Sequence, residues 1–356
     1  MVVAVLGVGL IGGSIGLAAR ERAGAGVTGW DPAPGVLDAA RERGAIEVRA
    51  QSLAGAVHDA DLVFVAAPVG ALPETVDAAL AVAGPECVVS DVGSTKREIV
   101  AGRDDPRFVG GHPLAGAETS GVDHARADLF AGATWYLTPT ERTSGILYER
   151  LHRFVAGLGA QPTAIDPAVH DRLMASVSHL PHVVANVLVS QAADALGDQD
   201  ERLPATGPSF RDATRVAGAN DAIWTDIYLA NREALVERID ELLRRLGDVR
   251  AALAGGNAGA VSAWNLEAGE DRRRLLERDL AGGPVHELRV SVPNQPGVVA
   301  RLALALGRAG INIVDMALYP APDMRDGVIA LWVGGDDAGQ RAEELISGLG
   351  HPVARP

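Results

Sequence analysis

The sequence has little cysteine and little positive charge. Of the 356 residues only Cys87 is a cysteine, which excludes an internal disulfide and favours a reducing compartment. Because Cys87 opens an apolar run, we expect an inert buried thiol. The formal net charge of −14 argues against nucleic acid and anionic membranes as partners. An anionic substrate would need local Arg, Lys or His to overcome this field.

Lysine and long hydrophobic runs are also scarce. Lys96 is the only lysine, and codon bias toward Arg in a GC-rich genome is the simplest explanation. The uncharged stretch 1–19 has no basic n-region and is interrupted by five glycines, so we expect neither a signal peptide nor an anchor there. We expect no other stretch to approach membrane-spanning length, and we predict a cytoplasmic protein.

The first twenty residues carry the clearest motif. Residues 2–6 are an apolar run that predicts a strand, and Gly7, Gly9 and Gly12 follow in the order G-x-G-x-x-G before an Ala-rich helical pattern. Gly7 permits a tight turn, Gly9 leaves room for a pyrophosphate to approach the backbone, and Gly12 lets the helix lie close to the strand. Free N–H groups at the start of the helix would face the anion.

An acidic residue follows the next apolar run. Residues 26–30 end at Asp31, roughly 20 residues beyond the glycines, where a carboxylate would bind a ribose 2′-hydroxyl. No Arg or Lys follows before Arg41, so we predict NAD rather than NADP as the cofactor. A glycine-rich turn with no ligand is the alternative. The residues expected to bind NAD are Gly7, Gly9, Leu10, Ile11, Gly12, Asp31, Pro68 and Ser94.

Near-continuous apolar strands alternate with helices as far as residue 165. This pattern predicts a parallel, Rossmann-like α/β sheet with both faces covered. Ligands bind beyond the carboxyl ends of such strands, and Pro68 and Ser94 follow two of them. The expected later strands are 61–66, 86–91, 133–137 and 161–165, and the expected helices are 36–43, 72–83 and 144–158.

Two further domains are predicted after this NAD-binding domain of residues 1–165. Residues 166–283 are helical almost throughout and begin with an Asp166-Pro167 N-cap, which predicts an all-helical domain for substrate binding and, by analogy, dimerisation. Residues 284–356 have a β-α-β-β-α-β order, which is typical of a ferredoxin-like α+β domain. Its expected helices are 296–309 and 340–349.

His112 is the first candidate catalytic residue. It follows a strand and two glycines, so we expect it on a loop at the ligand-binding edge of the sheet. An imidazole with an ordinary pKa of about 6.5 suits a general base. A loop histidine that only hydrogen-bonds its neighbours is the alternative. Ser94 could orient the imidazole, contact the cofactor, or cap a helix that starts at Thr95.

A histidine pair lies on the long helix predicted after residue 166. His179 and His182 are three residues apart, so their rings share one face. Anion binding, a metal pair and a polar seam between helices are competing explanations. No Asp, Glu or Cys stands at ligand spacing, so we expect no metal. Pro181 should kink the helix and free a carbonyl beside the pair.

Two arginines form a second candidate binding group. Arg211 and Arg215 are four residues apart on a predicted helix. One of them would bind a carboxylate in bidentate fashion while the other pairs with Asp212 or a Glu. Surface charge is the alternative for either one.

Five motifs together resemble the prephenate dehydrogenase family. They stand in the family's order and are the runs 7–12, 91–96, 111–116, 178–182 and 210–215. The resemblance covers the first two predicted domains nearly whole, and five motifs in register are far more specific than any one. It implies that His112 is the base acting on the ring hydroxyl of the substrate and that Ser94 assists it.

The resemblance also implies the residues that bind substrate and effector. His179 and His182 would line the site with Ser178, Arg215 would bind a substrate carboxylate, and Glu118 would lie near the entrance. The C-terminal domain resembles an ACT domain, a module that commonly binds amino acids at paired interfaces. The effector-binding residues would be Asn294, Gly297 and Asn312.

The activity that the resemblance implies is NAD-dependent oxidative decarboxylation of prephenate to 4-hydroxyphenylpyruvate in tyrosine biosynthesis. We also expect a homodimer, by analogy with other helical domains beside a dinucleotide fold, and tyrosine as an inhibitor that binds the C-terminal domain. Arogenate dehydrogenase is the nearest alternative, and nothing in the sequence separates the two substrates. More distant alternatives are a β-hydroxyacid or imine reductase and a non-catalytic sensor of NAD and amino acids.

Overall fold

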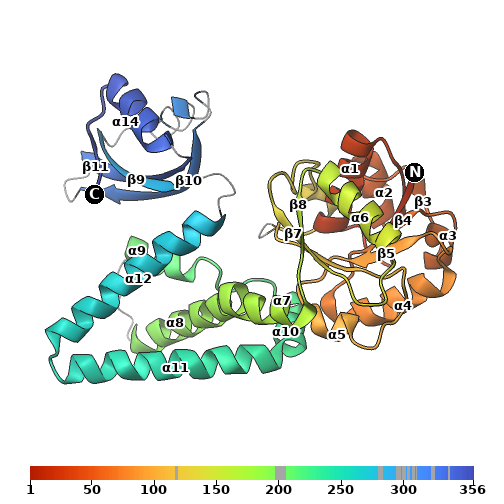
Figure 1. The fold of residues 1–356 in the computed structure, drawn as a ribbon, viewed down its shortest axis with the longest axis horizontal. Coiled ribbons are helices and arrows are strands. Elements are labelled where there is room, and N and C mark those ends of the chain that lie inside the picture. Colours follow the sequence, from red (N-terminus) through yellow and green to blue (C-terminus); the bar gives the residue numbers. More distant parts are fainter. Residues whose placement is uncertain are drawn as a thin grey trace. The chain divides into compact units, whose positions relative to one another are not determined.

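Packing divides the chain into two units, Met1–Leu243 and Arg244–Pro356, in this computed structural model (Figure 1). The predicted helical domain, residues 166–283, is therefore shared between the two units, and the three-domain division stays a prediction. The structure describes residues 1–116, 119–196, 206–279, 284–293, 298, 302, 305–306, 309, 311–321, 325–335 and 337–356.

A five-stranded parallel sheet forms the centre of the first unit, as predicted. Alternate residues of its first strand enter two different apolar cores, Val3 and Val5 in one and Ala4 and Leu6 in the other, so both faces of the sheet are covered. The strands, in spatial order, are β3 (Val48–Arg49), β2 (Gly26–Trp30), β1 (Val2–Leu6), β4 (Leu62–Val65) and β5 (Val88–Asp91).

Helices follow the strands of this unit and supply the two covering layers of the main sheet. The G-x-G-x-x-G turn leads from β1 directly into the first of them, as expected from the glycine spacing. They are α1 (Leu10–Ala23), α2 (Val36–Glu42), α3 (Leu53–Val57), α4 (Leu72–Val82), α5 (Arg97–Val100) and α6 (Gly145–Gly157), with 3-10 turns η1 (Val69–Ala71) and η2 (Val122–His124).

The later strands of this unit form a separate three-stranded sheet. Strand β7 (Thr134–Thr138) lies between β6 (Gly110–Pro113), to which it is antiparallel, and β8 (Gln161–Ala164), to which it is parallel. The fully buried Trp135 of β7 packs edge-on against Phe64 of β4, with ring centroids 6.0 Å apart. This aromatic contact joins the small sheet to the main one.

A long helical run follows residue 166 and contains one irregular turn. Asp166 caps it by accepting hydrogen bonds from the N–H groups of Ala168 and Val169, which matches the predicted N-cap. A π-helical turn, η3 (Ala175–His179), immediately precedes Pro181, so the helix is widened where the proline cannot donate. The run is α7 (Pro167–Met174), η3 and α8 (Leu180–Leu196).

By length and composition alone, the stretch Pro167–Asp194 could cross a membrane, because it contains an 18-residue window with a mean hydropathy of 1.3. The expectation that no such stretch exists was therefore wrong. Only 22% of that window is buried inside the chain. The remaining helices of this region are α9 (Pro208–Thr214), α10 (Asp221–Ala230) and α11 (Arg232–Ala254), the last of which continues into the second unit.

The second unit contains a four-stranded antiparallel sheet. The strand order β10-β11-β9-β12 is that of a ferredoxin-like domain, as predicted. The expected helix 296–309 lies mostly outside the described residues. The elements are α12 (Ala258–Asp279), β9 (Val285–Pro293), β10 (Asn312–Pro320), β11 (Asp326–Gly334), α14 (Ala338–Gly348) and β12 (Val353–Ala354).

Candidate active site

The three glycines after β1 are required for three different physical reasons. Gly7 has a φ of +91°, and a Cβ there would lie 2.5 Å from the carbonyl oxygen of Ala66. A Cβ on Gly12 would overlap the carbonyl oxygen of Gly7. A Cβ on Gly9 would meet nothing within 4 Å, and no side chain caps the start of α1. This open, positively polarised helix start fits a dinucleotide pyrophosphate.

Asp31 lies beside this turn at the end of β2. Its Oδ2 accepts a hydrogen bond from the N–H of Val8 (2.8 Å), and its Oδ1 accepts one from the N–H of Ala33 (2.8 Å). These bonds hold the carboxylate where the ribose of a dinucleotide would lie. Pro68 is exposed just beyond β4 and begins η1, whose Gly70 N–H donates to Asp226 Oδ2 of α10 (3.2 Å).

His112 lies within strand β6, so the expectation of a loop was wrong. The two preceding glycines serve close packing rather than a turn, because a Cβ on Gly111 would lie 2.7 Å from the carbonyl oxygen of Asp91 and 2.8 Å from Ser90 Oγ. The N–H of Gly111 donates to Asp91 Oδ1 (3.2 Å). The strand that carries His112 is therefore held against the carboxyl end of β5.

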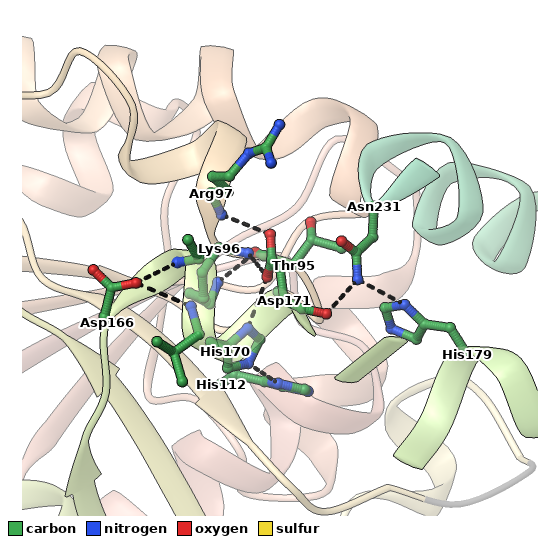
Figure 2. A network of polar contacts seen from close by, with 12 residues as sticks. Thr95, Lys96, Arg97, His112, Asp166, His170, Asp171, His179 and Asn231 are labelled. Carbon is green, nitrogen blue, oxygen red and sulfur yellow. Dashed lines mark hydrogen bonds and ion pairs between the residues drawn. The ribbon is translucent and has the colours of Figure 1, made fainter. Parts of the chain in front are cut away.

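Two residues that the sequence analysis missed, His170 and Asp171, form a chain of polar contacts with His112 (Figure 2). Nδ1 of His112 lies 2.9 Å from Nε2 of His170, and Nδ1 of His170 lies 2.8 Å from Oδ1 of Asp171. His170 is fully buried and Asp171 is 3% exposed. Both share the inward face of α7 with Met174. The signal in the sequence was a histidine and an aspartate at core positions of an amphipathic helix.

Asp171 also joins α7 to the segment after β5. Its Oδ1 accepts the backbone N–H of Lys96 (2.7 Å), and its Oδ2 accepts that of Arg97 (2.9 Å). Helix α5 begins at Arg97 and is capped by this carboxylate, so the suggested cap role of Ser94 was wrong. Ser94 itself is half-buried, and the group on Nδ1 of His112 is His170 rather than Ser94.

The single lysine lies inside this network. Lys96 is completely buried, and its Nζ donates to Asp91 Oδ2 and to the carbonyl oxygen of Thr95 (2.9 Å). Asp91 also accepts the N–H of Gly93 (2.8 Å). Burial lowers the pKa of Lys96, while the Asp91 carboxylate acts in the opposite direction. The pair anchors the turn between β5 and α5 beside the strand of His112.

His179 is linked to Asp171 through Asn231. Nδ2 of Asn231 donates to the carbonyl oxygen of Asp171 (2.8 Å) and lies 3.1 Å from Nδ1 of His179 (Figure 2). Burial lowers the pKa of His179 to about 4, so its ring is neutral near pH 7. Asn231, the residue between α10 and α11, is a third member of the network that the sequence analysis did not single out as functional.

His182 is the outer member of the histidine pair. Its ring stacks on the indole of Trp224, with centroids 3.5 Å apart and an interplanar angle of 26°. Burial lowers the pKa of His182, and the nearby Arg215 lowers it further. Arg215 is exposed at the end of α9 and Ser178 is half-buried in η3. Arg211 is also exposed.

Burial also has the largest effect on the pKa values of His112 and His170. It holds the pKa of His112 well below its usual 6.5, and the neighbouring His170, Lys96 and His179 act in the same direction. Burial likewise lowers the pKa of His170, although its hydrogen bond to Asp171 opposes this. Both rings are therefore neutral near pH 7 and can accept a proton.

The structure thus brings His112 and His179 into one buried network. Arg215, the arginine expected to bind a substrate carboxylate, is exposed near His182. Glu118 lies outside the described residues, as do Asn294 and Gly297. Asn312 begins strand β10, and its side chain is not described. Cys87 is buried as expected, and burial raises the pKa of its thiol to about 11, so the thiol is unreactive.

Three family models match the chain. Residues 15–163 match "Prephenate dehydrogenase, nucleotide-binding domain" and residues 166–264 match "Prephenate dehydrogenase, dimerization domain". Residues 286–333 match "ACT domain". The matches follow one another in the order of the predicted domains.

Full-length relatives and solved structures agree with these models. A prephenate dehydrogenase of Bacillus subtilis is 33% identical over 96% of this chain and 94% of its own length. The solved structure of Aquifex aeolicus prephenate dehydrogenase in complex with hydroxyphenyl propionate and NAD+ is similar, with a TM-score of 0.71, 27% identity, and coverage of 77% of this chain and 98% of that one. Synechocystis arogenate dehydrogenase is also similar, with a TM-score of 0.67, 27% identity, and coverage of 77% and 100%.

Proposed function

Because this chain belongs to the prephenate dehydrogenase family, we propose that it catalyses the NAD-dependent oxidative decarboxylation of prephenate to 4-hydroxyphenylpyruvate in tyrosine biosynthesis. One observation carries the proposal. His112 is a neutral, almost fully buried imidazole whose Nδ1 is engaged by His170 and whose Nε2 has no hydrogen-bond partner among the described residues. A base with one free lone pair is what removal of a hydroxyl proton requires.

The residues proposed to bind NAD+ follow the carboxyl ends of four strands of the parallel sheet, β1, β2, β4 and β5, which supports this assignment. Gly7, Gly9 and Gly12 form the turn at the N-terminus of α1, and Leu10 and Ile11 provide its first N–H groups. Asp31 would bind the ribose, while Pro68 and Ser94 follow the carboxyl ends of β4 and β5. When bound, NAD+ accepts the hydride that leaves the ring carbon bearing the hydroxyl group.

His112 would act first as a base and then as an acid. Its Nε2 accepts the hydroxyl proton as the ring carbon is oxidised, which creates a carbonyl. Loss of CO2 from the opposite ring carbon then returns an electron pair to that oxygen, which takes the proton back as the phenol forms. Aromatisation drives the reaction, so the protein mainly positions groups and stabilises charge.

The substrate is a dianion in a protein of negative net charge, so local cations must bind it. Arg215 is the permanently charged candidate beside His182. His179 and His182 are neutral near pH 7 and would act as hydrogen-bond donors rather than as cations. Ser178, in the family motif of residues 178–182, and Glu118, which the resemblance places near the entrance, complete the proposed substrate site.

A spectrophotometric assay of NADH formation tests this function. We expect turnover with prephenate and NAD+, little with NADP+, and a loss in kcat of roughly 10²–10⁴ in the His112→Ala variant. Faster turnover of arogenate than of prephenate would reassign the substrate. NAD binding without turnover of either substrate would favour the sensor alternative.

We also propose that the chain is a homodimer. The support is the match of residues 166–264 to a dimerization domain and a set of exposed apolar side chains on the helices of that stretch. Light scattering after size-exclusion chromatography should give twice the chain mass of 36.8 kDa. The exposed side chains are Val187, Leu188, Val236, Leu243, Leu246 and Trp264.

The C-terminal domain would provide regulation. We propose that tyrosine binds it through Asn294, Gly297 and Asn312 and inhibits the reaction, supported by the ACT-domain match. Kinetics with and without residues 284–356 test this, because inhibition that survives the truncation would move the effector to the active site. The domain limits 1–165, 166–283 and 284–356 and the cytoplasmic location stay predictions.

A further inference from the structure

The polar contacts behind His112 determine where its proton lies. Both carboxylate oxygens of Asp171 accept backbone N–H groups, from Lys96 and Arg97, so the ionised Asp171 can only accept from His170. The proton of neutral His170 is therefore on Nδ1, which leaves a lone pair on Nε2. That lone pair lies 2.9 Å from Nδ1 of His112, which must carry the hydrogen. The free lone pair of His112 is then on Nε2.

Burial makes this arrangement rigid. The rings of His112 and His170 meet edge to face at 71°, with centroids 5.1 Å apart, and Tyr136 also packs edge-on against His170, with centroids 5.6 Å apart. His170 has no exposed surface. The hydrogen-bond direction is set by Asp171 of α7, whose carboxylate is held by two backbone N–H groups at the start of α5, so neither ring can flip without leaving a buried polar group unpaired.

We propose that His170 and Asp171 are a buried positioning dyad that holds His112 in its Nδ1–H tautomer and takes up the positive charge while His112 keeps the substrate proton. This role rests on the proposed function. When Nε2 of His112 accepts the hydroxyl proton, its Nδ1 proton moves to Nε2 of His170, and the resulting imidazolium is paired with the Asp171 carboxylate. Reversal of the same transfers returns the proton to the phenol oxygen.

The overall reaction explains why the site that holds the proton during the cycle would be closed to water. Prephenate and NAD+ give 4-hydroxyphenylpyruvate, CO2 and NADH with no net release of a proton, so the proton is only held for part of the cycle. Lys96 disfavours a positive charge on either ring, but the carboxylates of Asp171 and Asp91 favour one on His170, and no carboxylate is among the main influences on His112. Moving the charge one ring inward places it beside a carboxylate instead.

Nuclear magnetic resonance of the substrate-free enzyme tests the tautomer directly. In protein labelled with ¹⁵N-histidine, His112 is assigned by the signal lost in His112→Gln, and long-range ¹⁵N–¹H correlations show which nitrogen bears hydrogen. We expect His112 and His170 each to carry it on Nδ1 at pH 7.5. A proton on Nε2 of His112, or exchange between tautomers, would overturn the proposal whether or not prephenate is turned over.

Kinetics of matched variants test the effect on catalysis. His170→Phe keeps the ring shape but removes the acceptor, so kcat with prephenate should fall at least tenfold and up to about 10⁴-fold, the loss caused by a wrong tautomer in the Ser-His-Asp triad. KM should change less than twofold. His170→Gln keeps an acceptor oxygen and should recover at least part of kcat. An unchanged kcat in His170→Phe contradicts the dyad.

A surface pair provides the control. His58 and Asp59 are also adjacent in sequence, but their side chains are 80% and 89% exposed. His58→Phe should leave kcat and the His112 signals unchanged. If the wild-type enzyme turns over neither prephenate nor arogenate, the proposed function fails, yet the spectra still decide whether the dyad sets the tautomer.

Discussion

A substitution in the turn before α1 can test cofactor binding without disturbing the folding of the protein. At Gly9, where φ is −84°, an added Cβ meets no protein atom within 4 Å, so Gly9→Ala should fold normally. The same methyl group would occupy the space through which a pyrophosphate approaches the backbone. Loss of one or two charge-assisted hydrogen bonds, at about 1.5–3 kcal/mol each, corresponds to roughly 10- to 10⁴-fold weaker NAD+ binding.

Calorimetric titration with NAD+ and thermal melting of the same samples measure the two effects. We expect Gly9→Ala to raise the Kd for NAD+ at least tenfold while its Tm stays within about 2 °C of wild type. Gly12→Ala is the opposite case, because its Cβ overlaps the backbone of Gly7, and it should lower Tm markedly. Gly145→Ala, another open glycine at a helix start, should change neither quantity. Wild-type NAD+ affinity in Gly9→Ala would show that the pyrophosphate does not cross this turn.

Three further predictions concern buried titratable groups. Lys96→Met leaves Asp91 buried without its cation and should cost about 3–5 kcal/mol, seen as a lower Tm, and Asp91→Asn in the same chain should recover part of that loss. The pKa of His179 is about 4 when folded and 6.5 when unfolded, so the unfolded chain binds more protons between these values. Stability should therefore fall by about 3 kcal/mol as pH drops from 6.5 to 4, and His179→Asn should flatten this part of a Tm-against-pH curve. Because the pKa of His112 lies well below 6.5, kcat/KM should stay level from pH 8 down to 6.5 and fall only in more acid solution. A fall centred above pH 7 would contradict that assignment.

Features set by neighbouring residues could be predicted from the sequence. The turn of Gly7, Gly9 and Gly12, the cap of Asp166 and the alternation of buried strands with helices depend on residues within a few positions of each other. Each has a local physical cause that leaves a pattern in the chain. Those patterns also predict the order along the chain of the parallel α/β sheet, the helical region and the ferredoxin-like domain.

The centre of the candidate site could not be predicted in this way. Asp171 caps α5 from about seventy-five positions further along the chain, and His170 meets His112 across a separation of fifty-eight. Asn231 reaches back sixty positions to the carbonyl of Asp171. No local pattern specifies such pairings, because they arise only when α7 packs against the ends of β5 and β6. The sequence analysis therefore assigned the orienting role to Ser94, which follows the carboxyl end of β5, and not to His170, which contacts the ring.

The burial of Lys96 gives the folded chain an uncommon chemical property. Since no other lysine exists, the folded chain offers acylating reagents no exposed lysine side chain. Acylation of Lys96 would therefore mark molecules in which the network around His112 has opened, and mass spectrometry of labelled samples would count those openings over time.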